Sequence, residues 1–253
     1  MSISMPLYDS EAVVLRRYAL ADSDYITIFL TKDYGKIRAV AQGVKRPNSR
    51  FAGNLEPLNH VFLEFYGREG RDLHRLRRAD LIRAYLSKNP SLKQTCVFNY
   101  FAEIIDELAQ EHQPNVHLFR LLLACLDTGV KMDPNSSLIR YFEIWCLKLS
   151  GLLPDYTYCS TCGKYVTNKG FFALPGTGHV RCAECAEGRG LKIGESAAVA
   201  LQNMMRVPPA TFAARTLKKE AAAELGSLTE RLLEMTLEKQ LKSGRLLKEF
   251  FAE

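Results

Sequence analysis

The sequence predicts an α+β protein of several domains: a small β-barrel, then an α-helical domain into which a cysteine-rich module is inserted. Three observations lead to this fold class. Short segments rich in β-branched and aromatic residues fill the first ninety positions, apolar residues then recur at helical spacing, and two Cys-x-x-Cys pairs interrupt the helices. We expect the barrel at 1–82 and the helical domain at 83–253, with the cysteine module at 154–192.

The first part of the chain has the pattern of a small barrel. Five strands are expected, at 11–17, 24–31, 36–43, 59–67 and 72–80. In the fourth segment Val61, Leu63 and Phe65 share one face, as the two-residue period of a half-buried strand requires. Because closing a sheet removes its exposed edges, five short strands in this length favour a closed barrel.

The pattern changes to helices at Asn89-Pro90. The capping box from Ser91 to Gln94 predicts a helix start, since its side chains satisfy free backbone N–H groups. A second helix is expected at 116–127, and Asp133-Pro134 is expected to open a third with Asp133 as the N-cap. Helices at 195–250 would complete the same domain after the cysteine module.

Composition and charge restrict the function classes. Apolar residues make up 47% and charged residues 25%, which is typical of a soluble protein. The chain has no apolar run of about 18 residues and no secretory pattern at its start, so we expect a cytoplasmic location. Residues 1–90 hold 15 Lys and Arg against 10 Asp and Glu, a net charge of +5. Such a basic part suits either a polyanionic partner or a solvated surface.

The cysteine module has the C-x2-C-x19-C-x2-C spacing of a four-thiolate zinc site, from Cys159 and Cys162 to Cys182 and Cys185. The apolar residues between the pairs are too few for a core, so one structural zinc ion per chain would stabilise a small ribbon. Disulfides, a redox dithiol and an iron–sulfur cluster are the alternatives. A catalytic zinc would keep an open position, and no histidine here has a glutamate two residues later, as zinc deaminases require.

The remaining cysteines have a different environment. Cys96, Cys125 and Cys146 stand among apolar residues, and we expect them to be buried thiols in a reducing compartment.

A basic segment from Tyr34 to Leu55 carries five cations and no acid. These cations are Lys36, Arg38, Lys45, Arg46 and Arg50. In the loop at 43–53 the cations can follow phosphates and Phe51 can stack on a base, which is how small barrels bind single strands. A second group contains Arg71, Arg75, Arg77 and Arg78, of which Arg75 and Arg77 share a strand face. The alternative is that Phe51 plugs the barrel and the cations are only solvated.

Three stretches of the sequence resemble the RecO family of bacterial DNA repair proteins. They are EAVVLRRYALADSDYITIFLTKDYGK, GKIRAVAQGVKRPNSRFAGNLEPLN and YCSTCGKYVTNKGFFALPGTGHVRCAEC. The resemblance runs from about residue 8 to the C-terminus with the elements in order. It implies an N-terminal OB-fold barrel, a helical C-terminal domain and a zinc ribbon with four cysteine ligands. It also implies a non-enzymatic protein of the RecF pathway that lies in the cytoplasm and is associated with the nucleoid.

The resemblance further implies partners and site residues. Such proteins bind single- and double-stranded DNA, anneal complementary strands, and with RecR help RecA to displace single-strand-binding protein. The family's pocket for the acidic tail of single-strand-binding protein lies in the helical domain. The resemblance makes the five cations of the basic segment the DNA contacts, and Cys159, Cys162, Cys182 and Cys185 the metal ligands.

The sequence motifs also bear on two other function classes. An enzyme is not expected, because the chain has no G-x-x-x-x-G-K-[ST], G-x-S-x-G or H-E-x-x-H motif. A zinc-ribbon transcription factor or RNA-binding factor is the alternative, although nothing resembles a helix-turn-helix or an RNP aromatic motif.

Overall fold

The computed structural model describes residues 5–20, 22–51, 53–67, 72–86 and 89–251. The chain forms two compact units, Met1–Arg120 and Leu121–Glu253. The sequence placed the domain boundary at 82–83, where strands give way to helices. The first compact unit extends further because helix α1 (Leu92–Leu108) packs against strands β1 and β2.

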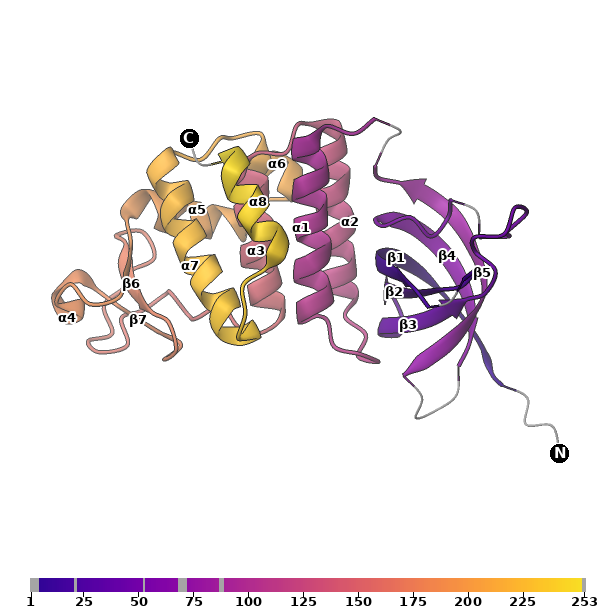
Figure 1. The fold of residues 1–253 in the computed structure, drawn as a ribbon. Helices are drawn as coiled ribbons and strands as arrows, with labels where there is room; N and C mark the ends of the chain where they lie inside the picture. Colours follow the sequence, from indigo (N-terminus) through magenta and orange to yellow (C-terminus); the bar gives the residue numbers. More distant parts are fainter. Residues whose placement is uncertain (1–4, 21, 52, 68–71, 87–88, 252–253) are drawn as a thin grey trace. The chain divides into compact units, whose positions relative to one another are not determined.

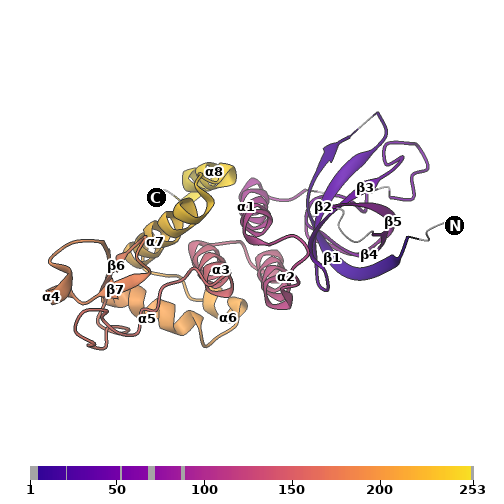
Figure 2. The same cartoon turned by 90° about the horizontal axis from the view of Figure 1, so that it is seen from below.

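Strands of the first unit close into a barrel (Figures 1 and 2). Within the described residues these strands are β1 (Leu7–Ala19), β2 (Tyr25–Thr31), β3 (Gly35–Ala41), β4 (Asn59–Tyr66) and β5 (Leu73–Ala84). The order around the barrel is β1-β2-β3-β5-β4, and β4 pairs back to β1. The β3–β5 pair is parallel and the other pairs are antiparallel. This Greek-key barrel confirms the predicted OB-fold.

The barrel interior is filled by apolar side chains from all five strands and from the β3–β4 loop. They are Ala12, Val14, Phe29, Ile37, Ala39, Ala41, Phe51, Leu55, Val61, Leu63, Phe65, Leu76 and Ala79. The predicted alternation in β4 is confirmed, since Val61, Leu63 and Phe65 are buried while Phe62 between them is exposed. The core therefore follows the two-residue period of the strands.

The helices begin close to where the capping signals predict. Ser91 caps α1, and its Oγ accepts a hydrogen bond from the Gln94 N–H at 3.0 Å, as predicted. The expected N-cap of α3 was wrong: the helix runs Ser136–Leu149, and Asn135 caps it instead of Asp133. The Asn135 side chain accepts a hydrogen bond from the Leu138 N–H and donates one to the Ala213 carbonyl. It therefore caps α3 and also links the start of this helix to residue 213.

The second unit joins helices from both sides of the cysteine module. Helix α2 (Val116–Lys131) spans the boundary between the units, and α5 (Glu195–Met204), α6 (Pro209–Ala213), α7 (Lys219–Leu237) and α8 (Lys242–Phe251) follow the module. Helix α3 packs against α6 and α7. Buried Glu143 of α3 lies 2.9 Å from Arg140 and accepts from Thr229 of α7 at 2.7 Å, so a satisfied polar contact crosses this packing.

The cysteine module forms a three-stranded sheet with one short helix. Strand β6 (Phe171–Leu174) lies between β7 (His179–Arg181) and β8 (Leu191–Ile193), and α4 (Ala183–Ala186) follows β7. The β6–β7 hairpin was predicted; β8 was not.

The isolated cysteines mostly match their predicted burial. Cys125 and Cys146 are fully buried, and burial raises the pKa of each thiol well above its usual range. Cys96 is only half-buried. No helix in the described ranges is long and apolar enough to cross a membrane.

Candidate metal centre and nucleic-acid interface

The four cysteines of the module converge on one point. Their sulfur atoms all lie within 4.8 Å of one another, although the two pairs are separated by a hairpin. The Sγ atoms of Cys162 and Cys182 are 3.7 Å apart. The prediction that the four residues form one cluster is confirmed, and the cluster can bind a metal ion.

The two cysteine pairs reach this point through different turns. In the first, the Gly163 N–H donates to the Cys159 carbonyl at 2.9 Å, and Gly163 has the positive φ of 70° expected for this glycine. In the second, Cys182 occupies the N-cap position of α4 and Cys185 lies within that helix. A helical turn thus replaces the glycine that the second pair lacks.

Protonation in the cluster is uneven. Burial acts to raise the pKa of Cys159, but backbone N–H groups of Cys182, Cys162 and Thr161 outweigh it and lower this pKa to about 6. Hydrogen bonds to Cys162 and Cys182 raise the pKa of Cys185 to about 12. Four sulfurs at this distance cannot all be thiolates without a cation among them, because their charges repel. The donor set is therefore suited to a positive ion.

The β3–β4 loop presents three predicted cations to solvent. Lys45, Arg46 and Arg50 are all exposed. The loop is fixed to the start of β2, because the Gly43 N–H donates to Asp24 Oδ1 at 2.8 Å and the Lys45 N–H to the Ser23 carbonyl at 3.2 Å. The three side chains are therefore accessible to solvent, and their contact with phosphates stays a prediction.

An aromatic side chain that the sequence analysis missed lies beside this loop. The half-buried ring of Tyr25 has the Lys45 Nζ 5.3 Å from its centroid and the Arg17 guanidinium carbon at 5.0 Å. Cations at these distances interact with the ring face. The available signal was an aromatic residue at the first position of a strand that borders the basic loop.

The structure corrects the interpretation of Phe51. Its side chain has 0% exposure and belongs to the barrel core, together with Leu55 from the same loop. A ring enclosed by the core cannot stack on a base, so the alternative reading, in which Phe51 plugs the barrel, is the one that the structure supports.

The structure also corrects the interpretation of Lys36. Its side chain is only 12% exposed, and its ammonium donates to the Asp106 carbonyl and lies 3.6 Å from Asp106 Oδ1. Lys36 therefore ties β3 to α1, and its ammonium is too little exposed to contact a DNA phosphate. Arg38 is 45% exposed but is paired with Glu111.

The second group of arginines lies on β5. Arg75 and Arg77 are exposed on the same face, as predicted, and Arg77 pairs with Glu64 of β4 at 3.1 Å. Arg78 pairs with Asp80 at 2.7 Å. Arg71 lies outside the described residues.

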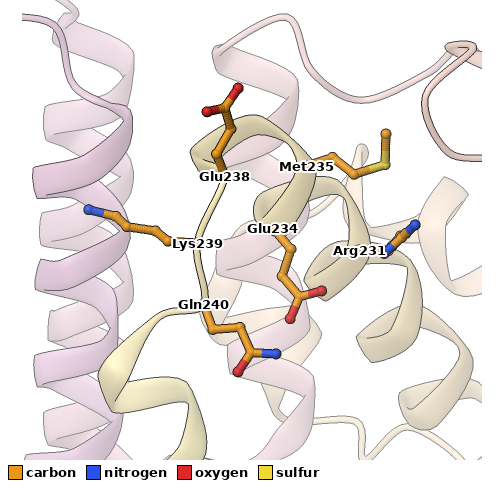
Figure 3. Close-up of a pocket in the computed structure, with 6 residues that line it drawn as sticks. All are labelled: Arg231, Glu234, Met235, Glu238, Lys239 and Gln240. Carbon is orange, nitrogen blue, oxygen red and sulfur yellow. The ribbon is translucent and has the colours of Figure 1, made fainter.

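A shallow hollow lies at the turn between α7 and α8 (Figure 3). It is lined by Arg231, Glu234, Met235, Glu238, Lys239 and Gln240. Two cations and two carboxylates give its lining no net charge, so its electrostatics favour neither an acidic nor a basic ligand.

Two family models match the chain. The model described as Recombination protein O N terminal matches residues 5–85, and the model described as Recombination protein O C terminal matches residues 90–245. The first match covers the barrel, and the second covers the cysteine module and the helices from α1 to the start of α8.

Curated relatives described as DNA repair protein RecO match over nearly the whole length. The relative from Koribacter versatilis (strain Ellin345) is 34% identical over 248 residues, which are 95% of this chain and 98% of the relative. The relative from Anaeromyxobacter sp. (strain K) is 32% identical over 239 residues, 94% of each chain. The relative from Desulforamulus reducens is 30% identical over 246 residues, 96% of this chain and 94% of the relative.

Proposed function

The chain belongs to the RecO family of DNA repair and recombination proteins, and on this premise we propose that it is a recombination mediator. In this role it binds single- and double-stranded DNA and anneals complementary strands without ATP. With RecR, it helps to load RecA onto DNA coated with single-strand-binding protein. It acts by binding rather than by covalent catalysis, and its place of action is the nucleoid, where its DNA lies.

The observation that carries this proposal is the exposed basic loop on an OB-fold barrel. Lys45, Arg46 and Arg50 are exposed, and the segment 42–55 that carries them contains no carboxylate. The Tyr25 ring lies beside these cations, whereas Arg17 next to it is paired with Glu56 of the same loop at 2.6 Å. A phosphate backbone that binds such a surface releases counterions, which supplies affinity without sequence preference. Arg38, Arg75 and Arg77 are proposed as secondary contacts, because two of them are already paired with carboxylates.

We propose that the cysteine cluster holds one structural zinc ion. With Zn–S bonds of about 2.3 Å, the sulfurs of a tetrahedral site lie about 3.8 Å apart. The separation of 3.7 Å between the sulfurs of Cys162 and Cys182 fits this geometry. All four coordination positions are filled by cysteine, so the ion would stabilise the ribbon and leave no position for a substrate.

The protein partners follow from family membership alone. RecR and the acidic C-terminal tail of single-strand-binding protein are proposed as ligands, the tail in the helical domain. The lining of the α7–α8 hollow has no net charge, so its electrostatics do not favour the binding of an acidic tail.

The proposal is tested by annealing two complementary DNA strands coated with single-strand-binding protein, in the absence of ATP. We expect the wild-type protein to accelerate annealing and the variant Lys45→Ala/Arg46→Ala/Arg50→Ala to lose most of this acceleration. RNA strands serve as a parallel substrate. No acceleration with DNA, or a marked preference for RNA, would contradict the mediator role.

A further inference from the structure

Three possible metal ligands from distant parts of the chain meet beside the barrel. Asp72 precedes β5, while Glu111 and His112 follow α1. Their ligand atoms all lie within 4.8 Å of one another, and His112 Nε2 is 3.9 Å from Asp72 Oδ1. Atoms bound about 2.1 Å from one ion lie roughly 3–4 Å apart. Small side-chain rotations therefore bring the three groups onto a single ion.

The backbone that carries Glu111 and His112 is fixed to the barrel. The Lys36 N–H donates to the Gln110 carbonyl and the His112 N–H donates to the Lys36 carbonyl, each at 3.2 Å. Gly35 allows this approach, because a Cβ there would lie 2.3 Å from the Gln113 carbonyl oxygen. The backbone at Glu111 and His112 is thus fixed beside β3.

A buried histidine, His74, lies next to the cluster. Within the part of the chain that the structure describes, neither ring nitrogen of His74 is satisfied, although the residue is only 8% exposed. Its ring meets the His112 ring edge-on, with 5.4 Å between centroids. A neutral imidazole carries one nitrogen lone pair that can face a cation. Buried polar atoms are almost always satisfied, so these two nitrogens mark a place where an ion or a water molecule can bind.

We propose that Asp72, Glu111 and His112 bind a second, divalent transition-metal ion, with His74 as a supporting nitrogen donor behind them. One imidazole and two carboxylates suit Mn²⁺ or Zn²⁺, whereas the four thiolates of the ribbon reject Mn²⁺. The two sites therefore differ in the metals that they accept. Arg38 would compete with the ion, because its guanidinium pairs with Glu111.

The test is a titration of the full-length, zinc-loaded protein with Mn²⁺, in which the electron paramagnetic resonance signal of free Mn²⁺ reports binding. We expect one Mn²⁺ per chain, displaced by added Zn²⁺ because zinc binds nitrogen and oxygen ligands more tightly. His112→Asn and Asp72→Asn should each weaken binding by about tenfold or more. Asparagine is chosen at 112 because it tolerates the positive φ of 59° there.

Three further variants separate a ligand role from a structural one. His117→Asn, at an exposed position on α2, is the matched control and should bind Mn²⁺ like the wild type. Arg38→Ala should tighten binding by roughly fivefold, the scale of one exposed ion pair, which a damaged fold could not do. His74→Phe should weaken binding by about 10–100-fold, as for other groups that support metal ligands, while thermal melting shows that the barrel remains folded.

Three results would overturn the proposal. They are the absence of Mn²⁺ binding by the wild type, wild-type affinity in both His112→Asn and Asp72→Asn, or weaker binding in Arg38→Ala.

Discussion

The barrel and the cysteine ribbon are both small β structures, yet different forces hold them. The barrel encloses a continuous apolar core that includes Phe29, Phe51 and Phe65. The ribbon strands have only 4, 3 and 3 residues. The ribbon's buried apolar side chains are few and mostly small: Val166, Phe171, Ala173, Val180, Ala186 and Ile193. Apolar burial can stabilise the barrel alone, whereas so small a core needs a metal. Each region should therefore fail under a different perturbation.

The largest expected effect is loss of the ribbon on removal of its metal. Apparent binding free energies of structural zinc sites are about 10–16 kcal/mol, and in such modules this is folding free energy. Cys162→Ser should open residues 154–192 to limited proteolysis while leaving the melting of the barrel unchanged. Thr161→Ala, an exposed non-ligand in the same turn, is the matched control. Equal protease resistance in the two variants would show that the metal does not hold the ribbon.

Metal content is measured on the same proteins. Elemental analysis should give one zinc per chain for the wild type and for Thr161→Ala, and much less for Cys162→Ser. Iron with visible absorption would replace the zinc assignment by an iron–sulfur cluster.

The second largest effect is expected in the barrel core. Phe51→Ala should lower the free energy of unfolding by about 3–5 kcal/mol, because it leaves a cavity among fully buried neighbours. Phe62→Ala, on the exposed face of β4, should cost much less. Denaturant unfolding compares the two. If Phe51→Ala keeps the stability of the wild type and loses only DNA affinity, the ring is a base-stacking group after all.

The sequence predicts a feature well when the contacts that form it join residues close together in the chain, and poorly when they join distant ones. The strands and the cysteine cluster are encoded locally, by two-residue alternation and by paired spacing, and the structure confirms both. Lys36 was misread because its partner Asp106 lies 70 positions away. Phe51 was misread because it directly follows the polar residues Ser49 and Arg50 in a loop, and only the closed barrel shows that its side chain enters the core. The Asp72–His112 cluster was missed for the same reason as the Lys36 contact.

A smaller effect is expected from the pH dependence of barrel stability. His74 has a lowered pKa in the folded protein, first through burial and then through the charge of His112. The unfolded chain therefore takes up this proton first, so stability is complete above about pH 6.5 and falls as the pH drops towards the lowered value. His74→Phe removes this proton uptake. Between about pH 7.5 and about pH 5.5 its melting temperature should fall less than that of the wild type. An equal fall in both proteins would assign the pH dependence to other groups.

The smallest effect on stability is expected from the exposed loop. Replacing Lys45, Arg46 and Arg50 together with alanine should change the free energy of unfolding by only about 0.5 kcal/mol per site or less, because the three side chains are exposed. Thermal melting checks this expectation. A large loss of stability would mean that these cations hold the loop in place.

The most direct test of the account is the salt dependence of binding to a labelled single strand, followed by fluorescence anisotropy. If the loop cations each neutralise one phosphate, the triple variant should lower the slope of log affinity against log salt by roughly 2, at about 0.7 per contact. Cys162→Ser and the matched surface variant Lys192→Ala/Arg206→Ala/Arg215→Ala should keep the wild-type slope. An unchanged slope in the loop variant, or a loss of slope in Cys162→Ser, would contradict the assignment of DNA binding to the barrel and of a purely structural role to the ribbon.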